Sequence, residues 1–390
     1  MSLNHETASS AGDTVSSIWR SQFQTTEDIS KHAASKTRGR NKFQYDINSV
    51  LALVHQTLPR IEKSHLRADR FLGSGSMFHV NREVYDDKAD IPITYWVAVK
   101  YMRTENRPDK HNQILQALVR ELRVITHPEL RGHPHIMSAL GYGWTDSGSG
   151  IERPFLVAPY AEYGTLSELL VAVSMQREVT IVERHDLMLD VAQGLQALHA
   201  CDFIHGDVKA NNVLVTTYTE PLGYTYGPNS VPWTAKIADF GSSMGRKEVE
   251  DGDARYTGTS VYNAPEVEGF TLSPRDMSLF EAYSKADVYS FGLLLWEVME
   301  GGQCYLDTIR TNDEALKSKR YTDYLRKLYQ GDGEILLEAA VQCCREVQFE
   351  ENNEKMRNCI EEAMKGCLRR KPVERMDMEN LVKVLERNVR

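Results

Sequence analysis

The chain has 390 residues, of which 41% are apolar and 26% charged, a globular composition that suits one large domain or two lobes. No apolar run approaches the roughly 18 residues of a membrane span, and the polar N-terminus lacks a signal-peptide core, so we expect a soluble intracellular protein without membrane insertion. Residues 1–65 hold eight Lys/Arg against six Asp/Glu, and the remainder holds 38 against 49; this acidic body argues against binding of nucleic acid. The six cysteines form no C-x-x-C pair, which favours free thiols over a zinc site.

Residues 1–45 are rich in Ser and Thr and poor in large apolar side chains, which predicts a disordered tail. We interpret its basic cluster KTRGRNK, residues 36–42, as a solvated charge run and expect a cytoplasmic protein; a nuclear address or a docking patch is the alternative. Residues 46–65 carry apolar residues at helical spacing, which predicts an amphipathic helix that packs on the following body. These apolar residues are Ile47, Val50, Leu51, Val54 and Leu58.

Between Phe71 and about Val157, short runs of β-branched and aromatic residues predict strands, interrupted by one helix over NQILQALVRELRVI. After AEYGTLSELL the apolar spacing becomes mainly helical. The run DVYSFGLLLWEVMEGG is apolar on nearly all faces, which predicts a buried helix that ends at Gly301 and Gly302. A small strand-rich part is therefore followed by a larger helical part, and a cleft at their junction is the default ligand site.

Two motifs of the strand-rich part suit a phosphate ligand. LGSGSMFHV places Gly73 and Gly75 between strands, where the backbone can approach a phosphate without hindrance from a Cβ, although an ordinary hairpin turn fits equally well. Further along, VAVK places Lys100 in an apolar strand, where an inward-pointing ammonium needs an anionic partner. Glu121 of the following helix is a candidate for that partner, while surface positions for both residues are the alternative.

The segment FIHGDVKANNVLV, residues 203–215, places Asp207, Lys209 and Asn212 in one short loop between two strand-like runs. Four further motifs follow in the order KIADFGSS, TGTSVYNAPEVE, KADVYSFG and CLRRKPVERM, with Asp239, Glu266, Asp287 and Arg375. Each motif is modest alone, but their order and spacing together are distinctive.

The chain resembles the eukaryotic protein kinases over roughly residues 68–388, because a glycine loop, a strand Lys, a helix Glu, a catalytic loop, D-F-G and A-P-E occur in kinase order. The segments DVYSFGLLLWEV and HPHIMSALGYGW resemble the tyrosine-kinase-like group, whose members mostly phosphorylate Ser and Thr. The resemblance implies an α+β, bilobal protein kinase fold, with a small five-stranded antiparallel N-lobe that carries the helix αC and a larger, mainly helical C-lobe. We place the kinase domain at 66–388, with the N-lobe at 66–158, the hinge at 159–163 and the C-lobe at 164–388.

The resemblance implies that Asp207 accepts or orients the proton of a substrate hydroxyl and that Lys209 steadies the γ-phosphate of ATP. Asn212 and Asp239 are implied to hold Mg²⁺. Thr259 matches the threonine that bridges the catalytic Asp and Lys in Ser/Thr kinases. Phosphoryl transfer needs an aligned hydroxyl and stabilised negative charge, which explains why carboxylates and a cation would converge on one point.

Nucleotide binding is implied for a second set of residues. Lys100 is expected to contact the α- and β-phosphates and to pair with Glu121, beside the phosphate-facing Gly73 and Gly75. The adenine and hinge contacts are implied at Val80, Ala98, Ala158, Pro159, Ala161 and Leu214. Ala158 matches the gatekeeper position, and its small side chain predicts an open back pocket.

Other motif residues are implied to be structural. His205 is expected to pack in the core under Phe240 and Ile125, and Asp287 to brace the backbone of the catalytic loop. Glu266 and Arg375 are expected to form an ion pair.

Three departures from the family pattern are present. Gly206 occupies the position where most kinases have the Arg that binds a phosphate on the activation loop, so we expect activity without activation-loop phosphorylation. Phe78 replaces the third glycine of the loop, which leaves phosphate approach at the first two glycines intact and is compatible with weaker loop closure. The Pro/Gly/Tyr-rich insertion at 216–233 is interpreted as tolerated, with a docking surface as the alternative.

We therefore expect an active, monomeric Ser/Thr protein kinase that uses ATP and Mg²⁺ on a protein substrate. A pseudokinase scaffold is the first alternative, favoured by Phe78 and Gly206 and opposed by the intact Lys100, Asp207 and Asp239. A small-molecule kinase is the second alternative, opposed by the substrate segment GTSVYNAPE, which those relatives usually lack.

Overall fold

The computed structural model describes residues 47–387, except 76, 88–92, 104–107, 147–151, 172–177, 218–232, 270–276, 311–324, 326–327, 330–333 and 348–352. The predictions for the tail at 1–45 and for most of the insertion at 216–233 therefore fall outside the described residues. The chain divides into two compact units. The first comprises the chain through Leu122 together with Ser138–Tyr160, and the second comprises Arg123–Met137 and the chain from Ala161 onward.

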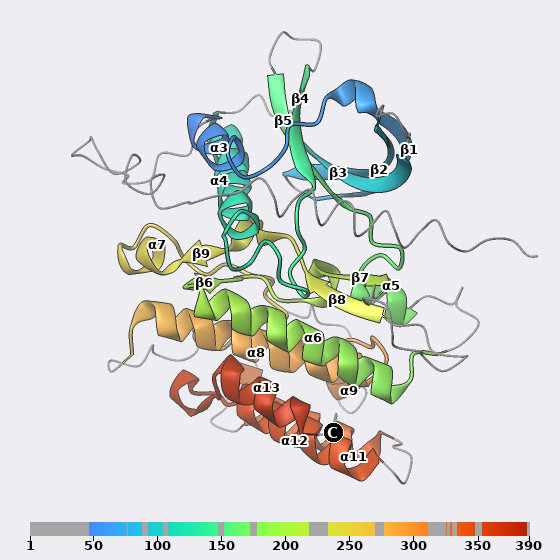
Figure 1. Cartoon of the computed structure of the whole chain (residues 1–390). Coiled ribbons are helices and arrows are strands. Elements are labelled where there is room, and N and C mark those ends of the chain that lie inside the picture. Colours follow the sequence, from blue (N-terminus) through green and yellow to red (C-terminus); the bar gives the residue numbers. More distant parts are fainter. Residues whose placement is uncertain are drawn as a thin grey trace, which may run out of the picture. The chain divides into compact units, whose positions relative to one another are not determined.

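The first unit contains a five-stranded antiparallel sheet with the strand order β1-β2-β3-β5-β4 (Figure 1). Its strands are β1 Leu66–Ser74, β2 Phe78–Asp87, β3 Ile93–Met102, β4 Gly141–Asp146 and β5 Glu152–Pro159. β-branched and aromatic residues are frequent in the central strand β3, as expected for a β-strand. Helix α4, Pro108–Ile125, begins at a proline, where the missing N–H costs no helical hydrogen bond. The predicted five-stranded sheet with one helix is confirmed.

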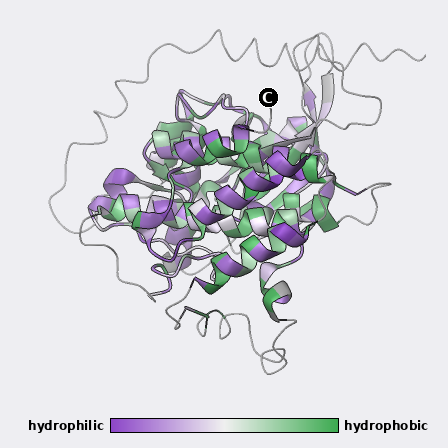
Figure 2. Cartoon of the chain, turned by 90° about the horizontal axis from the view of Figure 1, so that it is seen from below, coloured by the Kyte–Doolittle hydropathy of each residue, from purple (hydrophilic) through white to green (hydrophobic). Residues whose placement is uncertain are grey.

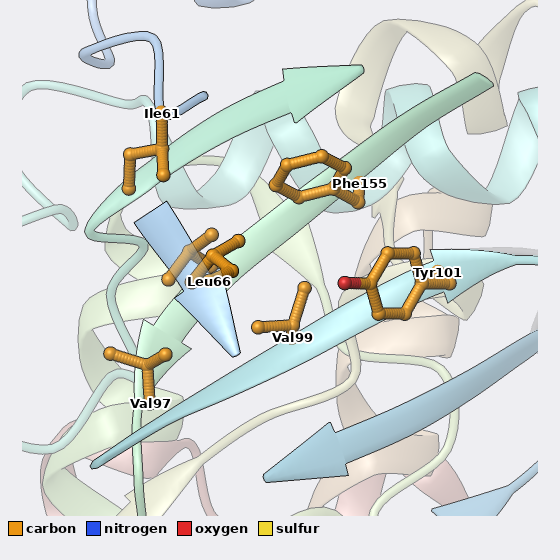
Figure 3. Close-up of a cluster of buried hydrophobic side chains, with 7 residues drawn as sticks. Ile61, Leu66, Val97, Val99, Tyr101 and Phe155 are labelled. Carbon is orange, nitrogen blue, oxygen red and sulfur yellow. The ribbon is translucent and has the colours of Figure 1, made fainter. Parts of the chain in front are cut away.

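Alternation along β3 gives the sheet two different faces. One face packs into a buried apolar cluster formed by Ile61, Leu66, Val97, Val99, Tyr101, Phe155 and Val157 (Figure 3). Because successive side chains of a strand point to opposite faces, Ala98 and Lys100 lie on the other face. The core thus fixes which face of the sheet carries the predicted nucleotide contacts.

The segment before β1 is part of the first unit's core. Helix α3, Ile47–Val54, buries Val54 completely, and Ile61 belongs to the cluster of Figure 3. Between them the chain runs beside β4: the Ile61 N–H donates to the Tyr142 carbonyl at 2.7 Å, and the Tyr142 N–H donates to the Pro59 carbonyl at 3.0 Å. The sheet therefore continues, beyond its named strands, into residues that precede β1.

Two glycines of β4 make this close approach possible. A Cβ on Gly141 would lie 2.6 Å from the Ile61 side chain, and a Cβ on Gly143 would lie 2.3 Å from the Ile61 carbonyl oxygen. The predicted helix over 46–65 is accordingly too long. It ends at Val54, a turn over residues 55–57 follows, and Pro59–Ile61 then run beside β4 instead of completing the helical face.

The second unit is mainly helical, as the C-lobe was predicted to be. Helices α6, Ile181–Ala200, and α8, Leu279–Met299, pack against each other, and each begins with a capping box, at Thr180 and Ser278 respectively. Most of α8 is buried, and Gly301–Gly302 follow it with φ of +77° and +89°, which confirms the predicted buried helix and its glycine end.

Figure 2 shows purple and green residues alternating along the helices on the side that it views, as expected for helices with one polar and one apolar face. The described residues of the second unit form six shorter helices. They are α5 Leu166–Val171, α7 Arg246–Glu250, α9 Tyr305–Arg310, α11 Ile335–Glu346, α12 Glu354–Cys367 and α13 Met378–Glu386. The described part of the chain holds no helix of the length and apolarity that crossing a membrane would require.

Two small antiparallel ladders frame the motif-bearing loops of the second unit. Strand β6, Phe203–Ile204, pairs with β9, Met244–Gly245, and β7, Val213–Thr217, pairs with β8, Trp233–Ile237. The predicted catalytic loop, residues 205–212, therefore runs from one ladder to the other. The turn η3, Phe240–Ser242, leads from the second ladder back to the first.

Candidate functional site

One buried carboxylate anchors the predicted catalytic loop. Asp287 of α8 is 0% exposed, and its oxygens accept the backbone N–H groups of His205 at 2.7 Å and Gly206 at 3.0 Å. The same carboxylate accepts a bond from the Tyr256 hydroxyl at 2.9 Å and lies 3.0 Å from Nε2 of His199. The predicted bracing of the loop by Asp287 is confirmed, and the structure adds two partners that no motif indicated.

The ionised form of Asp287 is favoured in spite of its burial. Burial alone would raise the pKa of this carboxyl, because a buried charge loses its hydration. The hydrogen bond and charge of His199, together with His205, outweigh this effect, so the pKa of Asp287 lies below its ordinary value. A negative charge inside the second unit thus aligns two backbone N–H groups of the loop.

Asp207, Lys209 and Thr259 form a closed triangle of hydrogen bonds. Lys209 Nζ donates to Asp207 Oδ2 and to Thr259 Oγ1, each at 2.8 Å, and Thr259 Oγ1 donates to Asp207 Oδ1 at 2.7 Å. Asn212 Nδ2 donates to the backbone oxygen of Asp207 at 2.8 Å and to its Oδ2 at 3.0 Å. The Asp207 carboxylate is therefore fixed in orientation while its side chain stays 16% exposed.

Gly206 has a conformational reason to be glycine. Its φ is +79°, a region that residues with a Cβ rarely adopt, and a Cβ there would lie 2.6 Å from the carbonyl oxygen of Ser242. An arginine in this backbone would meet both obstacles. The backbone conformation of the loop thus favours glycine over the arginine of the family pattern at this position.

Asp239 and Phe240 are neighbours that differ in exposure. Asp239 is exposed and adopts the left-handed conformation, with φ 60° and ψ 68°, which is rare for a residue with a Cβ. Phe240 is buried, and its ring meets the His205 ring edge-to-face at 5.6 Å, which confirms the predicted contact between these two residues. The buried ring thus anchors the turn that directly follows Asp239.

In the first unit, Lys100 pairs with Glu121 as predicted. Lys100 Nζ lies 2.6 Å from Glu121 Oε2, and the two side chains are 18% and 10% exposed. The strand register sets Val80 opposite Lys100 and Ala158 opposite Ala98, so these side chains share the face that looks away from the apolar cluster.

The glycine turn between β1 and β2 is open beside its backbone. A Cβ on Gly73 or Gly75 would meet no heavy atom within 4 Å, and the Gly75 N–H donates to the Phe78 carbonyl at 2.9 Å. Pro159 ends β5, whereas Ala161 and Leu214 belong to the second unit. The predicted nucleotide contacts are thus divided between the two units.

The activation segment, residues 239–266, is held by contacts that sequence motifs did not reveal. Arg246 donates to Asp202 Oδ1 from Nε at 2.9 Å and from Nη2 at 2.7 Å. The fully buried Glu248 carboxylate lies 3.3 Å from Nη1 of Arg123. These partners are 44 and 125 residues apart in sequence, and no local pattern marks them.

The end of the activation segment is fixed by the predicted ion pair. Arg375 donates to Glu266 through both terminal nitrogens, at 2.6 and 2.8 Å, with both side chains buried. This bidentate geometry is the strongest form of the arginine–carboxylate contact.

Residues 66–385 match the family of protein tyrosine and serine/threonine kinases. The chain belongs to this family. Serine/threonine-protein kinase PknK of Mycobacterium bovis is 32% identical over 212 residues, which cover 54% of this kinase and 16% of PknK. A probable serine/threonine-protein kinase of Dictyostelium discoideum is 25% identical over 327 residues, or 84% of this kinase and 16% of that protein. Tyrosine-protein kinase SYK of Gallus gallus is 29% identical over 232 residues, or 60% and 32% of the two chains. This kinase thus matches 16% of the length of its first two relatives.

A pair of alanine variants can separate the clash of a Cβ at position 206 with Ser242 from the cost of placing a residue with a Cβ at positive φ. Gly206→Ala should lower the midpoint of thermal unfolding more than Gly252→Ala, because both glycines have a φ near +79° but a Cβ on Gly252 has open space around it. The control should lose only the left-handed penalty of about 1–2 kcal/mol in the free energy of unfolding. Equal losses for the two variants would contradict the clash with Ser242.

Proposed function

We propose that this kinase transfers the γ-phosphate of ATP to Ser and Thr hydroxyls of a protein substrate, with Mg²⁺ as the cation. The observation that carries the proposal is the triangle of Asp207, Lys209 and Thr259, in which a carboxylate and an ammonium are fixed together. Membership of the kinase family supports phosphoryl transfer in general.

Asp207 is the proposed acceptor of the hydroxyl proton. Hydrogen bonds from Lys209, Thr259 and Asn212 already hold its carboxylate, so little reorganisation is needed when the substrate hydroxyl arrives. We assign Lys209 the stabilisation of negative charge on the transferred phosphoryl group. Both roles need the loop backbone to stay in place, and Asp287 holds that backbone.

Two residues fit a magnesium ion by their chemistry. Asp239 presents an exposed carboxylate, and Asn212 donates through its Nδ2 to Asp207, which leaves its carbonyl oxygen as a ligand. Carboxylate and amide oxygens are hard donors of the kind that Mg²⁺ prefers. The ion would neutralise charge on the phosphates during transfer.

The proposed nucleotide contacts start at the phosphates. Lys100, paired with Glu121, is assigned to the α- and β-phosphates, and the open backbone at Gly73 and Gly75 fits their close approach. The adenine and hinge contacts are assigned to Val80, Ala98, Ala158, Pro159, Ala161 and Leu214. The shared sheet face of the first three supports this assignment.

Preference for Ser and Thr over Tyr rests on the second unit. Lys209 bonds both Asp207 and Thr259, the arrangement implied by the resemblance to Ser/Thr kinases. The relatives are mixed: PknK is a serine/threonine-protein kinase and SYK a tyrosine-protein kinase. The local geometry, not overall similarity, therefore supports the Ser/Thr assignment.

We also propose that the kinase works without a phosphate on its activation segment. Gly206 has no side chain that could bind such a phosphate. The activation segment is instead held by two ion pairs, Arg246 with Asp202 and Glu248 with Arg123. Tyr256 adds a bond to the buried Asp287. Such internal ion pairs and hydrogen bonds can replace the ordering that a phosphate supplies elsewhere.

Asp207→Asn should reduce transfer of labelled phosphate from ATP by at least about 10²-fold, because an amide cannot accept the hydroxyl proton. Asp186→Asn, at an exposed carboxylate, is the control and should retain the rate. Acid hydrolysis of the autophosphorylated wild type should release phosphoserine or phosphothreonine. Phosphotyrosine alone would contradict the residue assignment, and absence of turnover in the wild type would favour the pseudokinase scaffold.

A variant without four of the hydroxyls of the activation segment should keep most of the activity. In this variant alanine replaces Ser242, Ser243, Thr257 and Ser260 together. Ser243 is already buried with its hydroxyl near the His205 carbonyl, at 3.3 Å, so its loss removes one internal hydrogen bond rather than a phosphate site. Steady-state rates of this variant and of phosphatase-treated wild type measure the effect. A collapse of both rates would refute phosphate-independent activity.

A further inference from the structure

Phe78, the residue that replaces the third glycine, contacts Lys100 directly. The Lys100 ammonium lies 4.7 Å from the centroid of the Phe78 ring, while the same ammonium lies 2.6 Å from Glu121 Oε2. Phe78 is 8% exposed, so its ring is not a solvent-exposed loop side chain. The ammonium thus meets an aromatic face in addition to a carboxylate.

The contact follows from the register of the sheet. Phe78 begins β2 opposite Met102, and Val80, two residues later, lies opposite Lys100. Phe78 and Lys100 are therefore diagonal neighbours on one face, a separation that aromatic and long side chains span. The bond from Gly75 to the Phe78 carbonyl ties this position to the glycine turn.

We propose that Phe78 is a positioning residue for Lys100. Its ring holds the ammonium beside Glu121, so the Lys100 side chain is already ordered when the nucleotide phosphates bind. The proposal rests on the proposed kinase function. A cation over an aromatic face is attracted by the negative ring quadrupole, and the attraction is stronger where water is largely excluded, as it is around the buried ring. A glycine at this position would offer the ammonium no such face.

The proposal predicts that loss of the Phe78 ring weakens the binding only of ligands that carry phosphates. Phe78→Leu keeps an apolar side chain of similar size but removes the quadrupole, whereas Phe78→Tyr keeps the aromatic face. Phe78→Leu should weaken binding of Mg²⁺–ATP by about 3- to 30-fold, a range that follows from the usual strength of a cation–π contact. Adenosine has no phosphates, so its binding should be unchanged.

Isothermal titration of the full chain with Mg²⁺–ATP and with adenosine tests this prediction. Phe78→Tyr should bind ATP like the wild type, and Phe71→Leu, at an exposed phenylalanine of β1, is the matched control and should also bind normally. Replacement of Phe78 by phenylalanines with one, two and three ring fluorines should weaken ATP binding stepwise, because fluorine withdraws charge from the ring face.

Three results would overturn the inference: equal ATP affinity in the Leu and Tyr variants, equal weakening of adenosine and ATP, or tighter ATP binding by Phe78→Leu. The last result would mean that the ring competes with the phosphates. If the wild type binds neither ligand, the proposed kinase function fails together with the inference. If it binds ATP and the Leu variant matches it, only the role of Phe78 fails.

Discussion

A buried negative charge at Asp287 is the constraint on which the rest of the second unit depends. The carboxylate accepts hydrogen bonds from two backbone N–H groups of the proposed catalytic loop and from the hydroxyl of Tyr256 in the activation segment. Burial of a charge is costly, and these donors offset the cost. Each donor left without its acceptor would cost about 1–3 kcal/mol, so the loop, the activation segment and α8 are held as one network.

The same network explains why a glycine precedes Asp207. The N–H of Gly206 points to Asp287, and its φ of +79° is what lets the chain turn from that anchor toward the triangle with Lys209 and Thr259. The kinase pattern that the sequence resembles has an arginine here, which is expected to bind a phosphate on the activation segment. In this kinase we propose that Tyr256 and the arginine–carboxylate pairs make that link permanently.

Sequence motifs predicted the parts of the site that depend on fixed local spacing. Asp207, Lys209 and Asn212 lie within six residues, and their geometry follows from the loop that carries them. The Lys100–Glu121 and Glu266–Arg375 pairs could be predicted because the family pattern defines both partners.

The remaining contacts depend on how distant segments pair, which spacing does not encode. The contact of Phe78 with Lys100 needs the register of β2 on β3, and the clash at Gly206 needs the position of Ser242. The helix predicted over 46–65 stops at Val54, and Pro59–Ile61 then run beside β4. Gly141 and Gly143 allow this approach, but no sequence pattern predicted it. Residues with no motif, such as Tyr256 and Glu248, could not have been selected from sequence.

The most direct test of the account is the turnover number of Asp287→Asn. The NH₂ group of an asparagine would face N–H and O–H donors and leave some of them without an acceptor. The variant should keep its helical circular dichroism and its ATP affinity, but its rate of phosphate transfer should fall by at least about 10²-fold. Asp253→Asn, at an exposed carboxylate of the activation segment, should retain the wild-type rate. A folded Asp287→Asn protein with wild-type turnover would contradict the claim that this buried charge positions the catalytic loop.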